Sequence, residues 1–466
     1  MPETTLPRPL DLPLTVDRSD GASMSAQLVG QLRAALAEGR LAAGERLPSG
    51  RALAGTLGVS RTVVTEAYEQ LYAEGWLEGR HGSGTYVTEG VAARPPEGAA
   101  PGVPGPCGDG PPRRGAGTID LRPGIAWIGI LDTPAWRRAW RLAARMPPRV
   151  PRQDPHGLPG LRALLASYIR RSRGVACPVD GVLVTRGATS GLDLLAAAVL
   201  RPGDRVGIEE PGYMRARSVL AGRGAEVVPC PVDEHGLVVE GLPDDLRLVY
   251  TTPSHQYPLG GVLPVARRRA LLAWARRNGA LVAEDDYDGE FRYDVAPLPA
   301  LYGLDPEVVV YLGTTAKTLT ADMGVGWLVA RPDLVAAVAR RRDELNDRTP
   351  LVPQEALRIL LERGDLERYV RRMRAEYARR REAVVEALGG LRLRGDTAGL
   401  HVVVDLPAPV VERVRDGAAE RGVLVQTLDP YHSGPARVTG LVIGYGAATL
   451  AQLRTGCALI ADLAAR

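Results

Sequence analysis

The sequence predicts two folded parts of different class, and three observations support this. The chain has 466 residues, and at roughly 100–200 residues per domain that is enough for several domains. Residues 89–118 are rich in Pro, Gly and Ala without apolar periodicity, which is typical of a linker. The segment before the linker has mainly helical patterning, whereas short apolar runs alternate with amphipathic runs after it. We therefore expect a small domain over residues 14–88 and a larger α/β domain over residues 119–466.

The small domain has the pattern of three helices followed by a hairpin. Residues 25–38 place leucines on one helical face, and residues 49–58 form a short second helix between a serine and a glycine. A third helix is expected over residues 60–75. Residues 76–80 and 85–88 have the pattern of two strands around the tip HGSG. This order of elements predicts a winged helix-turn-helix.

Such a fold places its last helix in the major groove of DNA, so the first turn of that helix reaches the bases. The overall net charge is +4, and residues 11–89 hold seven arginines against ten acidic residues. Positive charge is therefore local, and binding would require a dimer on two half-sites of operator DNA. The expected DNA contacts lie on the third helix, the helix before it and the hairpin tip: Arg51, Ser60, Arg61, Thr62, Thr65, His81 and Gly82.

The large domain alternates strand and helix patterns, which predicts a mostly parallel sheet covered on both faces. The expected strands are residues 182–185, 205–209, 246–251, 280–285 and 308–313, with helices such as 266–277 between them. Beyond residue 331 the chain is helical and rich in arginine, and then has strands at 401–405, 423–426 and 441–445. We expect a large subdomain over about residues 150–330 and a smaller α+β subdomain over about residues 331–466.

Composition narrows the class of protein further. The four cysteines form no CxxC pair, which predicts a reducing compartment and no structural metal. The N-terminus lacks the apolar run of a signal peptide, and the apolar run at residues 194–200 is too short to span a bilayer. We expect a cytoplasmic protein with no membrane partner.

Lysine usage is the most informative feature of the composition. Of 58 basic residues, Lys317 is the single lysine. Arginine replaces lysine wherever a permanent charge suffices, but not where an amine must lose its proton and attack a carbonyl. Chance survival of a surface lysine remains the alternative on composition alone.

The residues found together with Lys317 in this sequence predict a site for pyridoxal 5'-phosphate (PLP). A lysine that forms a Schiff base with PLP needs a carboxylate for the pyridine nitrogen, a hydroxyl at the ring oxygen, an aromatic stacking partner and a phosphate site. Taken singly each signal is weak, since an acidic cluster such as EDDYD is more often a solvated strand end. In order along the chain, the residues expected to serve these roles are Gly187, Ala188, Thr189, Tyr213, Asp285, Tyr287 and Thr314.

The motifs resemble known families. The string LPSGRALAGTLGVSRTVVTEAYEQLYAEGWLEGRHGSGTYV is similar to the winged-helix domain of the GntR regulators, whose DNA-contacting positions match the seven residues named above. From about residue 119 the chain resembles the fold-type I aminotransferases. TPSHQYPLGG, EDDYDGEFRY and GTTAKTL resemble motifs of the MocR/GabR-type regulators, which fuse these two domains.

The resemblance implies a head-to-tail, domain-swapped homodimer with PLP on Lys317. It implies that Asp285 contacts the pyridine nitrogen, Tyr287 the ring oxygen and Tyr213 the ring face. Tyr257 occupies the position where true aminotransferases carry an asparagine.

Three departures from the family pattern bear on mechanism. Gly324 stands where an arginine usually contacts the PLP phosphate, and Val442 where an arginine usually binds the substrate carboxylate. Arg152 replaces a tyrosine that reaches the phosphate from the neighbouring subunit, so it could restore the lost charge. Without the bidentate arginine, amino-acid transamination is disfavoured. Arg437 could bind a carboxylate only if its loop reshaped, and His401 is expected to be a packed core histidine rather than an effector contact.

The leading hypothesis is therefore a transcriptional regulator that binds operator DNA and uses PLP as a sensor. Either an amine effector that displaces Lys317 or PLP itself would shift the population of two dimer conformations. A second hypothesis is an active aminotransferase with a passenger DNA-binding domain. A third is a regulator that no longer binds PLP and senses another ligand.

Overall fold

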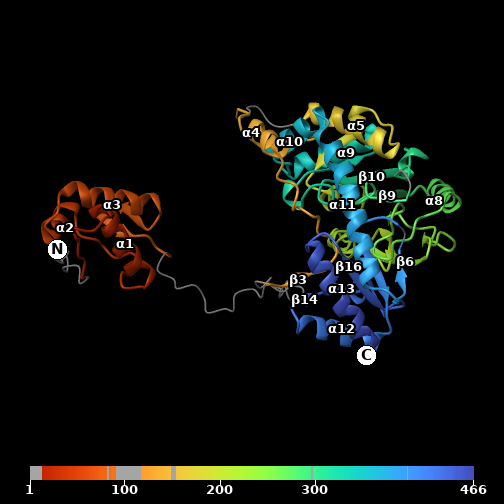
Figure 1. The fold of residues 1–466 in the computed structure, drawn as a ribbon. Helices are drawn as coiled ribbons and strands as arrows, with labels where there is room; N and C mark the ends of the chain where they lie inside the picture. Colours follow the sequence, from red (N-terminus) through yellow and green to blue (C-terminus); the bar gives the residue numbers. More distant parts are fainter. Residues whose placement is uncertain (1–12, 81–82, 91–116, 148–153, 295–296, 396) are drawn as a thin grey trace, which may run out of the picture. The chain divides into compact units, whose positions relative to one another are not determined.

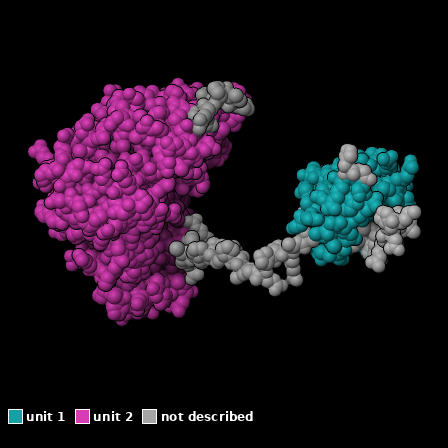
Figure 2. Space-filling view, turned by 180° about the vertical axis from the view of Figure 1, so that it is seen from behind, with its two compact units in different colours: residues 1–112 teal, residues 113–466 magenta. Residues whose placement is uncertain are grey.

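The computed structural model describes residues 13–80, 83–90, 117–147, 154–294, 297–395 and 397–466. The chain divides into two compact units, residues 1–112 and 113–466 (Figure 2). Across the ranges described, no helix combines the length and the apolar character needed to cross a membrane.

The first unit is a winged helix-turn-helix, as the sequence predicts (Figure 1). Its helices are α1 (Met24–Ala37), α2 (Gly50–Leu57) and α3 (Arg61–Ala73), and its antiparallel hairpin is β1 (Leu77–Arg80) with β2 (Gly84–Val87). The hydroxyls of Ser49 and Ser60 accept hydrogen bonds from the first turns of α2 and α3, as N-caps do. Leucines on the inner faces of the helices, such as Leu32 and Leu71, form the core.

The second unit is built on an eight-stranded sheet in the order β4-β11-β10-β9-β8-β5-β6-β7. The pairs from β10 through β9, β8 and β5 to β6 are parallel, which confirms the predicted mostly parallel sheet. Strand β11, which the sequence pattern did not reveal, runs antiparallel between β10 and β4. The strands are β4 (Val182–Thr185), β5 (Arg205–Glu210), β6 (Glu226–Asp233), β7 (Gly236–Leu237), β8 (Leu248–Thr251), β9 (Leu281–Asp285), β10 (Val309–Thr314) and β11 (Gly326–Val329).

Helices cover both faces of this sheet, because alternate strand residues are apolar in both directions. On β10, Val310 and Leu312 pack with α6, α7 and α9, whereas Val309 and Tyr311 belong to the core that includes α5, α8 and α10. These helices are α5 (Pro159–Arg173), α6 (Ala188–Val199), α7 (Met214–Gly222), α8 (Val265–Asn278), α9 (Pro332–Glu344) and α10 (Leu351–Glu362), and α10 packs against α4 (Pro134–Ala143).

The smaller subdomain carries an antiparallel four-stranded sheet in the order β12-β13-β16-β15. Its strands are β12 (Leu393–Arg394), β13 (His401–Asp405), β15 (Gln426–Thr427) and β16 (Gly440–Gly444), and its helices are α11 (Asp365–Ala387), α12 (Ala408–Ala419) and α13 (Leu450–Ala465). The single strand predicted at 423–426 was wrong. Residues there divide between β14 (Val423–Leu424), which pairs with β3 (Ile119–Asp120), and β15, which pairs with β16.

Candidate functional site

The residues predicted to bind PLP follow the ends of strands in the large sheet. Asp285 is the last residue of β9, and Lys317 comes three residues after β10. Tyr213 follows β5, and Gly187 follows β4 and precedes α6. Because ligands of open α/β sheets bind beyond the carboxyl ends of parallel strands, the fold places these side chains where a site is expected.

Asp285 has an unusual environment for a carboxylate. Its Oδ2 accepts a hydrogen bond from the Tyr250 hydroxyl at 2.6 Å. Its Oδ1 is buried and has no hydrogen-bond partner among the described residues. Burial raises the pKa of Asp285 to about 7, against the hydrogen bond from Tyr250 and the nearby charge of Lys317, which lower it. The buried, unpartnered oxygen is a vacant acceptor for a ligand N–H.

The amine of Lys317 interacts electrostatically with this carboxylate, and the residue is partly buried. Its Nζ donates to the backbone oxygen of Gly124 at 2.6 Å. Burial lowers the pKa of Lys317, although the charges of Asp288 and Asp285 oppose this, and Arg215 lowers it further. The environment therefore moves the amine toward its neutral, nucleophilic form. Sequence reasoning missed Gly124, Asp288 and Arg215, because only the fold brings them to Lys317.

The predicted phosphate loop is formed at the start of α6. Gly187 has φ +122° and is the N-cap of this helix, so Ala188 and Thr189 occupy its first turn. A Cβ at Gly187 would lie 3.8 Å from the Thr314 hydroxyl oxygen, and one at Gly326 would lie 2.6 Å from Gly187 Cα. The structure thus brings the loop and Thr314 together, with helix N–H groups that suit an anion.

Aromatic side chains gather around Tyr257. Its ring makes edge contacts with Tyr213 at 5.8 Å, Tyr287 at 5.5 Å and Tyr431 at 5.4 Å between centroids. Its hydroxyl lies 3.1 Å from that of Tyr431, which belongs to a short 3₁₀ helix of the smaller subdomain. The hydroxyl of Tyr213 lies 3.5 Å from the Thr189 hydroxyl. Tyr213, Tyr257 and Tyr287 therefore line one connected surface.

A buried glutamate fixes the loop that carries Tyr257. Glu209 on β5 is 1% exposed and accepts hydrogen bonds from the Thr251 and Thr252 hydroxyls at 2.5 and 2.6 Å. It also accepts from the backbone N–H of Thr252 at 3.0 Å and from Gln256 at 3.3 Å. Burial raises the pKa of Glu209, against these four hydrogen bonds, so the carboxylate is a structural anchor.

The positions that depart from the family pattern are structurally adapted. Gly324 has φ +58°, so an L-residue there would be strained, although its Cβ would meet nothing within 4 Å. Val442 is fully buried with Leu259, Val403, Leu428 and Tyr431. Arg437 is exposed in the loop before β16, whereas Arg152 lies outside the described residues. The carboxylate position is therefore occupied by an apolar cluster.

The predicted DNA-reading residues lie on the exposed side of the first unit. Ser60 caps α3, and Arg61, Thr62 and Thr65 are exposed on its first turns. Arg51 is exposed on α2. Neither the Arg51 nor the Arg61 guanidinium has a hydrogen bond or ion pair with any described residue, so both groups are available to phosphate or base edges. His81 and Gly82, at the predicted wing tip, lie outside the described residues.

Comparison with known proteins agrees with this division. Residues 24–87 match the family of bacterial regulatory proteins, gntR family, and residues 129–445 match aminotransferase class I and II. The chain is 38% identical to the HTH-type pyridoxine biosynthesis transcriptional regulator PdxR of Corynebacterium glutamicum, over 97% of this chain and 98% of the relative. It is 34% identical to the probable rhizopine catabolism regulatory protein MocR of Rhizobium meliloti, over 95% and 94%.

Among solved structures, the second unit is similar to an archaeal alanine:glyoxylate aminotransferase. The TM-score is 0.70 at 24% identity, covering 74% of this chain and 90% of the other. The fold and the site define a transcriptional regulator that binds DNA through a winged helix and carries an aminotransferase-like domain. The chain belongs to the MocR-type subfamily of the GntR regulators.

Proposed function

We propose that this regulator binds PLP at Lys317 and that PLP itself is the effector that changes its affinity for operator DNA. The observation that carries the first part is the buried Oδ1 of Asp285, which has no hydrogen-bond partner among the described residues. The same carboxylate interacts electrostatically with Lys317, the only lysine of the chain. A pyridine N–H would satisfy this oxygen, and its positive charge would stabilise the ionised carboxylate. When bound, PLP supplies an aldehyde that reacts reversibly with amines.

The residues of the chain would divide the work of holding PLP. Asp285, oriented by Tyr250, would accept the pyridine proton, and Tyr213 would cover the ring face. The N–H groups of Gly187, Ala188 and Thr189, with the Thr314 hydroxyl, would bind the phosphate. Arg152 would add charge from the second subunit of a head-to-tail homodimer.

The choice of PLP as effector rests on Val442. An amino-acid effector presents a carboxylate, whose strongest recognition is a bidentate arginine. Here the corresponding position is 0% exposed and packed with Leu259 and Val403, so a carboxylate brought there would be buried without a partner. The relative from Corynebacterium glutamicum is named as a regulator of pyridoxine biosynthesis. By analogy, we propose that this chain controls genes that supply PLP.

The proposed division of labour follows the predicted domains. Residues 14–88 would bind one half-site each in a dimer, and residues 119–466 would sense PLP. The linker over residues 89–118 would set how far each winged helix reaches. A PLP-dependent change in dimer conformation would alter the spacing of the two recognition helices, and so the affinity for two half-sites.

Absorbance of the full chain mixed with PLP tests the cofactor assignment. We expect a visible band that borohydride reduction removes, and a reduced adduct on Lys317. Because the chain has one lysine, peptide mapping separates this adduct from the α-amino group without ambiguity. Lys317→Arg is the matched control, since it keeps the charge and removes the reactive amine. No reducible band in the parent protein would exclude PLP binding at Lys317.

Footprinting on the protein's own promoter tests the effector assignment. We expect protection to change with PLP in the parent protein and to be insensitive to PLP in Lys317→Arg. A response to an amino acid but not to PLP would support the amine-effector alternative. Turnover of an amine donor above the Lys317→Arg background would support the aminotransferase alternative.

A further inference from the structure

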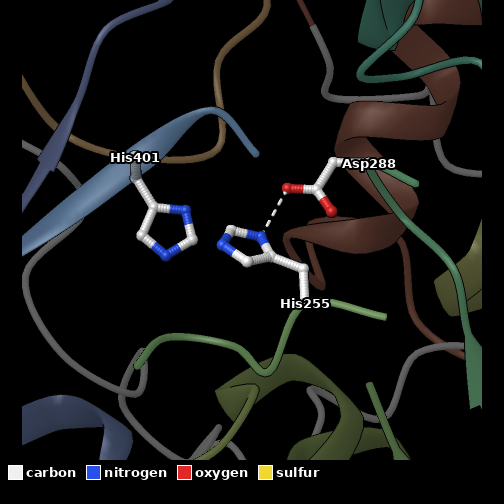
Figure 3. Close-up of side chains that lie close together, drawn as sticks. All are labelled: His255, Asp288 and His401. Atoms are coloured by element: carbon white, nitrogen blue, oxygen red, sulfur yellow. Dashed lines mark hydrogen bonds and ion pairs between the residues drawn. The ribbon is translucent and has the colours of Figure 1, made fainter. Parts of the chain in front are cut away.

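Three buried polar side chains have no part in holding PLP in the proposed site, although Asp288 and His401 interact electrostatically with Lys317. They are His255, Asp288 and His401, with 3%, 2% and 5% of their surface exposed. Figure 3 shows the Asp288 carboxylate directed at one ring nitrogen of His255, while the other ring nitrogen lies toward His401. Oδ2 of Asp288 lies 2.9 Å from Nδ1 of His255. Since a carboxylate accepts, Nδ1 carries a proton.

The same nitrogen also contacts the tyrosine expected at the ring oxygen of PLP. The hydroxyl oxygen of Tyr287 lies 2.9 Å from His255 Nδ1 and donates its own proton to the backbone oxygen of His255 at 3.1 Å. With its proton directed there, the Tyr287 oxygen accepts from the imidazole N–H, which is shared between Tyr287 and the Asp288 carboxylate. When PLP binds, the single Tyr287 proton would turn from the His255 oxygen to the ring oxygen of PLP, and a hydroxyl that accepts from an imidazole N–H donates that proton more strongly.

The His255 ring is confined in this orientation. A Cβ at Gly399 would lie 2.0 Å from Cε1 of His255 and 2.7 Å from Oδ2 of Asp288, so the backbone packs directly on the pair. The His401 ring centroid lies 5.1 Å from that of His255, and its Nε2–H donates to the Pro258 oxygen at 2.8 Å. Burial lowers the pKa of His401 to about 4, so this neighbour is neutral near pH 7. The packing at Gly399 and the hydrogen bond to Asp288 therefore hold the ring in this orientation.

A metal ion fits this cluster less well than a shared proton. One ligand atom from each of the three residues lies within 4.8 Å of the others, which is a loose ligand set. Nδ1 of His255 is already used by Asp288 and Tyr287, and Nε2 of His401 by the Pro258 oxygen. The existing hydrogen bonds thus account for one nitrogen of each imidazole without a metal.

We propose that His255, oriented by Asp288, is a positioning residue that holds the Tyr287 hydroxyl for the ring oxygen of PLP and strengthens that hydrogen bond. The inference rests on the proposed PLP site. The role of His255 would add specificity, because the hydrogen bond from Tyr287 stabilises only a ligand that carries an oxygen beside its aldehyde. Analogues without this oxygen would lose the contribution of His255.

The test compares PLP with an analogue that lacks the ring hydroxyl, using the full-length protein and its variants. His255→Gln removes the Nδ1–H, whereas His255→Asn keeps an amide N–H near the same position. Losing one neutral hydrogen bond predicts about three- to tenfold weaker binding of PLP by His255→Gln. We expect near-parental binding by His255→Asn, and no effect of His255→Gln on the analogue or in the Tyr287→Phe background.

The outcomes distinguish this role from the proposed function itself. If the parent protein binds no PLP, the proposed function fails and this inference fails with it. If the parent binds PLP but His255→Gln weakens the binding of PLP and of the analogue equally, His255 is structural and only the positioning role is overturned.

Thermal melting checks that each variant is folded. If His255→Gln does not fold, Asp288→Asn replaces it, because loss of the carboxylate frees the imidazole to turn from Tyr287. An unchanged preference for PLP in Asp288→Asn would also overturn the role.

Discussion

Replacing Asp285 with asparagine should stabilise the PLP-free protein and weaken PLP binding. Burial raises the pKa of Asp285 from 3.8 to about 7. A carboxyl group whose pKa is raised by folding does not destabilise the folded state at a pH below its pKa in the unfolded chain. The destabilisation reaches its full size at a pH above its pKa in the folded protein. At about 1.4 kcal/mol per pKa unit, the cost above pH 7 is about 4 kcal/mol.

Asparagine removes this charge, but its amide N–H₂ would be a buried donor where Oδ1 now lies, which costs about 1–3 kcal/mol. We therefore expect a net gain of about 1–3 kcal/mol in the free energy of unfolding above pH 7. The gain should shrink as the pH falls from about 7 toward 4, because the parent carboxylate then takes up a proton. Glu284 and Glu290 also have pKa values raised to about 7. Their effects on stability cancel in the comparison, because the parent and Asp285→Asn both contain these glutamates.

Thermal unfolding of the two PLP-free proteins across this pH range is the assay, with PLP affinity measured in parallel. A parent protein as stable as Asp285→Asn above pH 7 would refute the reasoning about the buried charge. Tighter PLP binding by the variant would refute the assignment of Asp285 to the pyridine nitrogen.

Three further predictions concern single residues. Arg61→Ala should abolish protection of operator DNA without changing the melting temperature. Arg40 is paired with Glu38, so Arg40→Ala should leave protection nearly intact. Equal losses of protection in the two variants would argue against recognition by α3. Gly324→Ala should lower the free energy of unfolding by about 1–2 kcal/mol because φ is +58°, and an unchanged unfolding curve would contradict that backbone. Gly399→Ala should lower the melting temperature clearly more than Gly422→Ala, since both glycines have positive φ but only Gly399 faces His255 and Asp288. Equal losses would show that the structure relieves the overlap between the added Cβ and His255.

Local patterns predicted most elements, because caps and periodicity are local. Ser49 and Ser60 mark the starts of α2 and α3, and the run at 401–405 is β13 as expected. Strand β11 was missed because a short antiparallel strand between two others has no signature of its own. The hydrogen bonds from Tyr250 to Asp285 and from His255 to Asp288 join residues 35 and 33 positions apart. Spacing alone does not predict such pairs, since only the packed sheet brings them together.

The retained and lost site residues support the same conclusion. Gly324 and Val442 are not simple losses of arginine, because the backbone at one is left-handed and the other is packed in an apolar cluster. Gly324 thus leaves the PLP phosphate without its usual arginine, and Val442 leaves the substrate carboxylate without one. Asp285, in contrast, keeps a buried carboxylate oxygen without a partner among the described residues, and burial raises the pKa of this carboxylate to about 7. A buried carboxylate oxygen without a partner is most simply explained by a ligand that satisfies it. This combination supports our proposal that the domain holds PLP for sensing and not for amino-acid transamination.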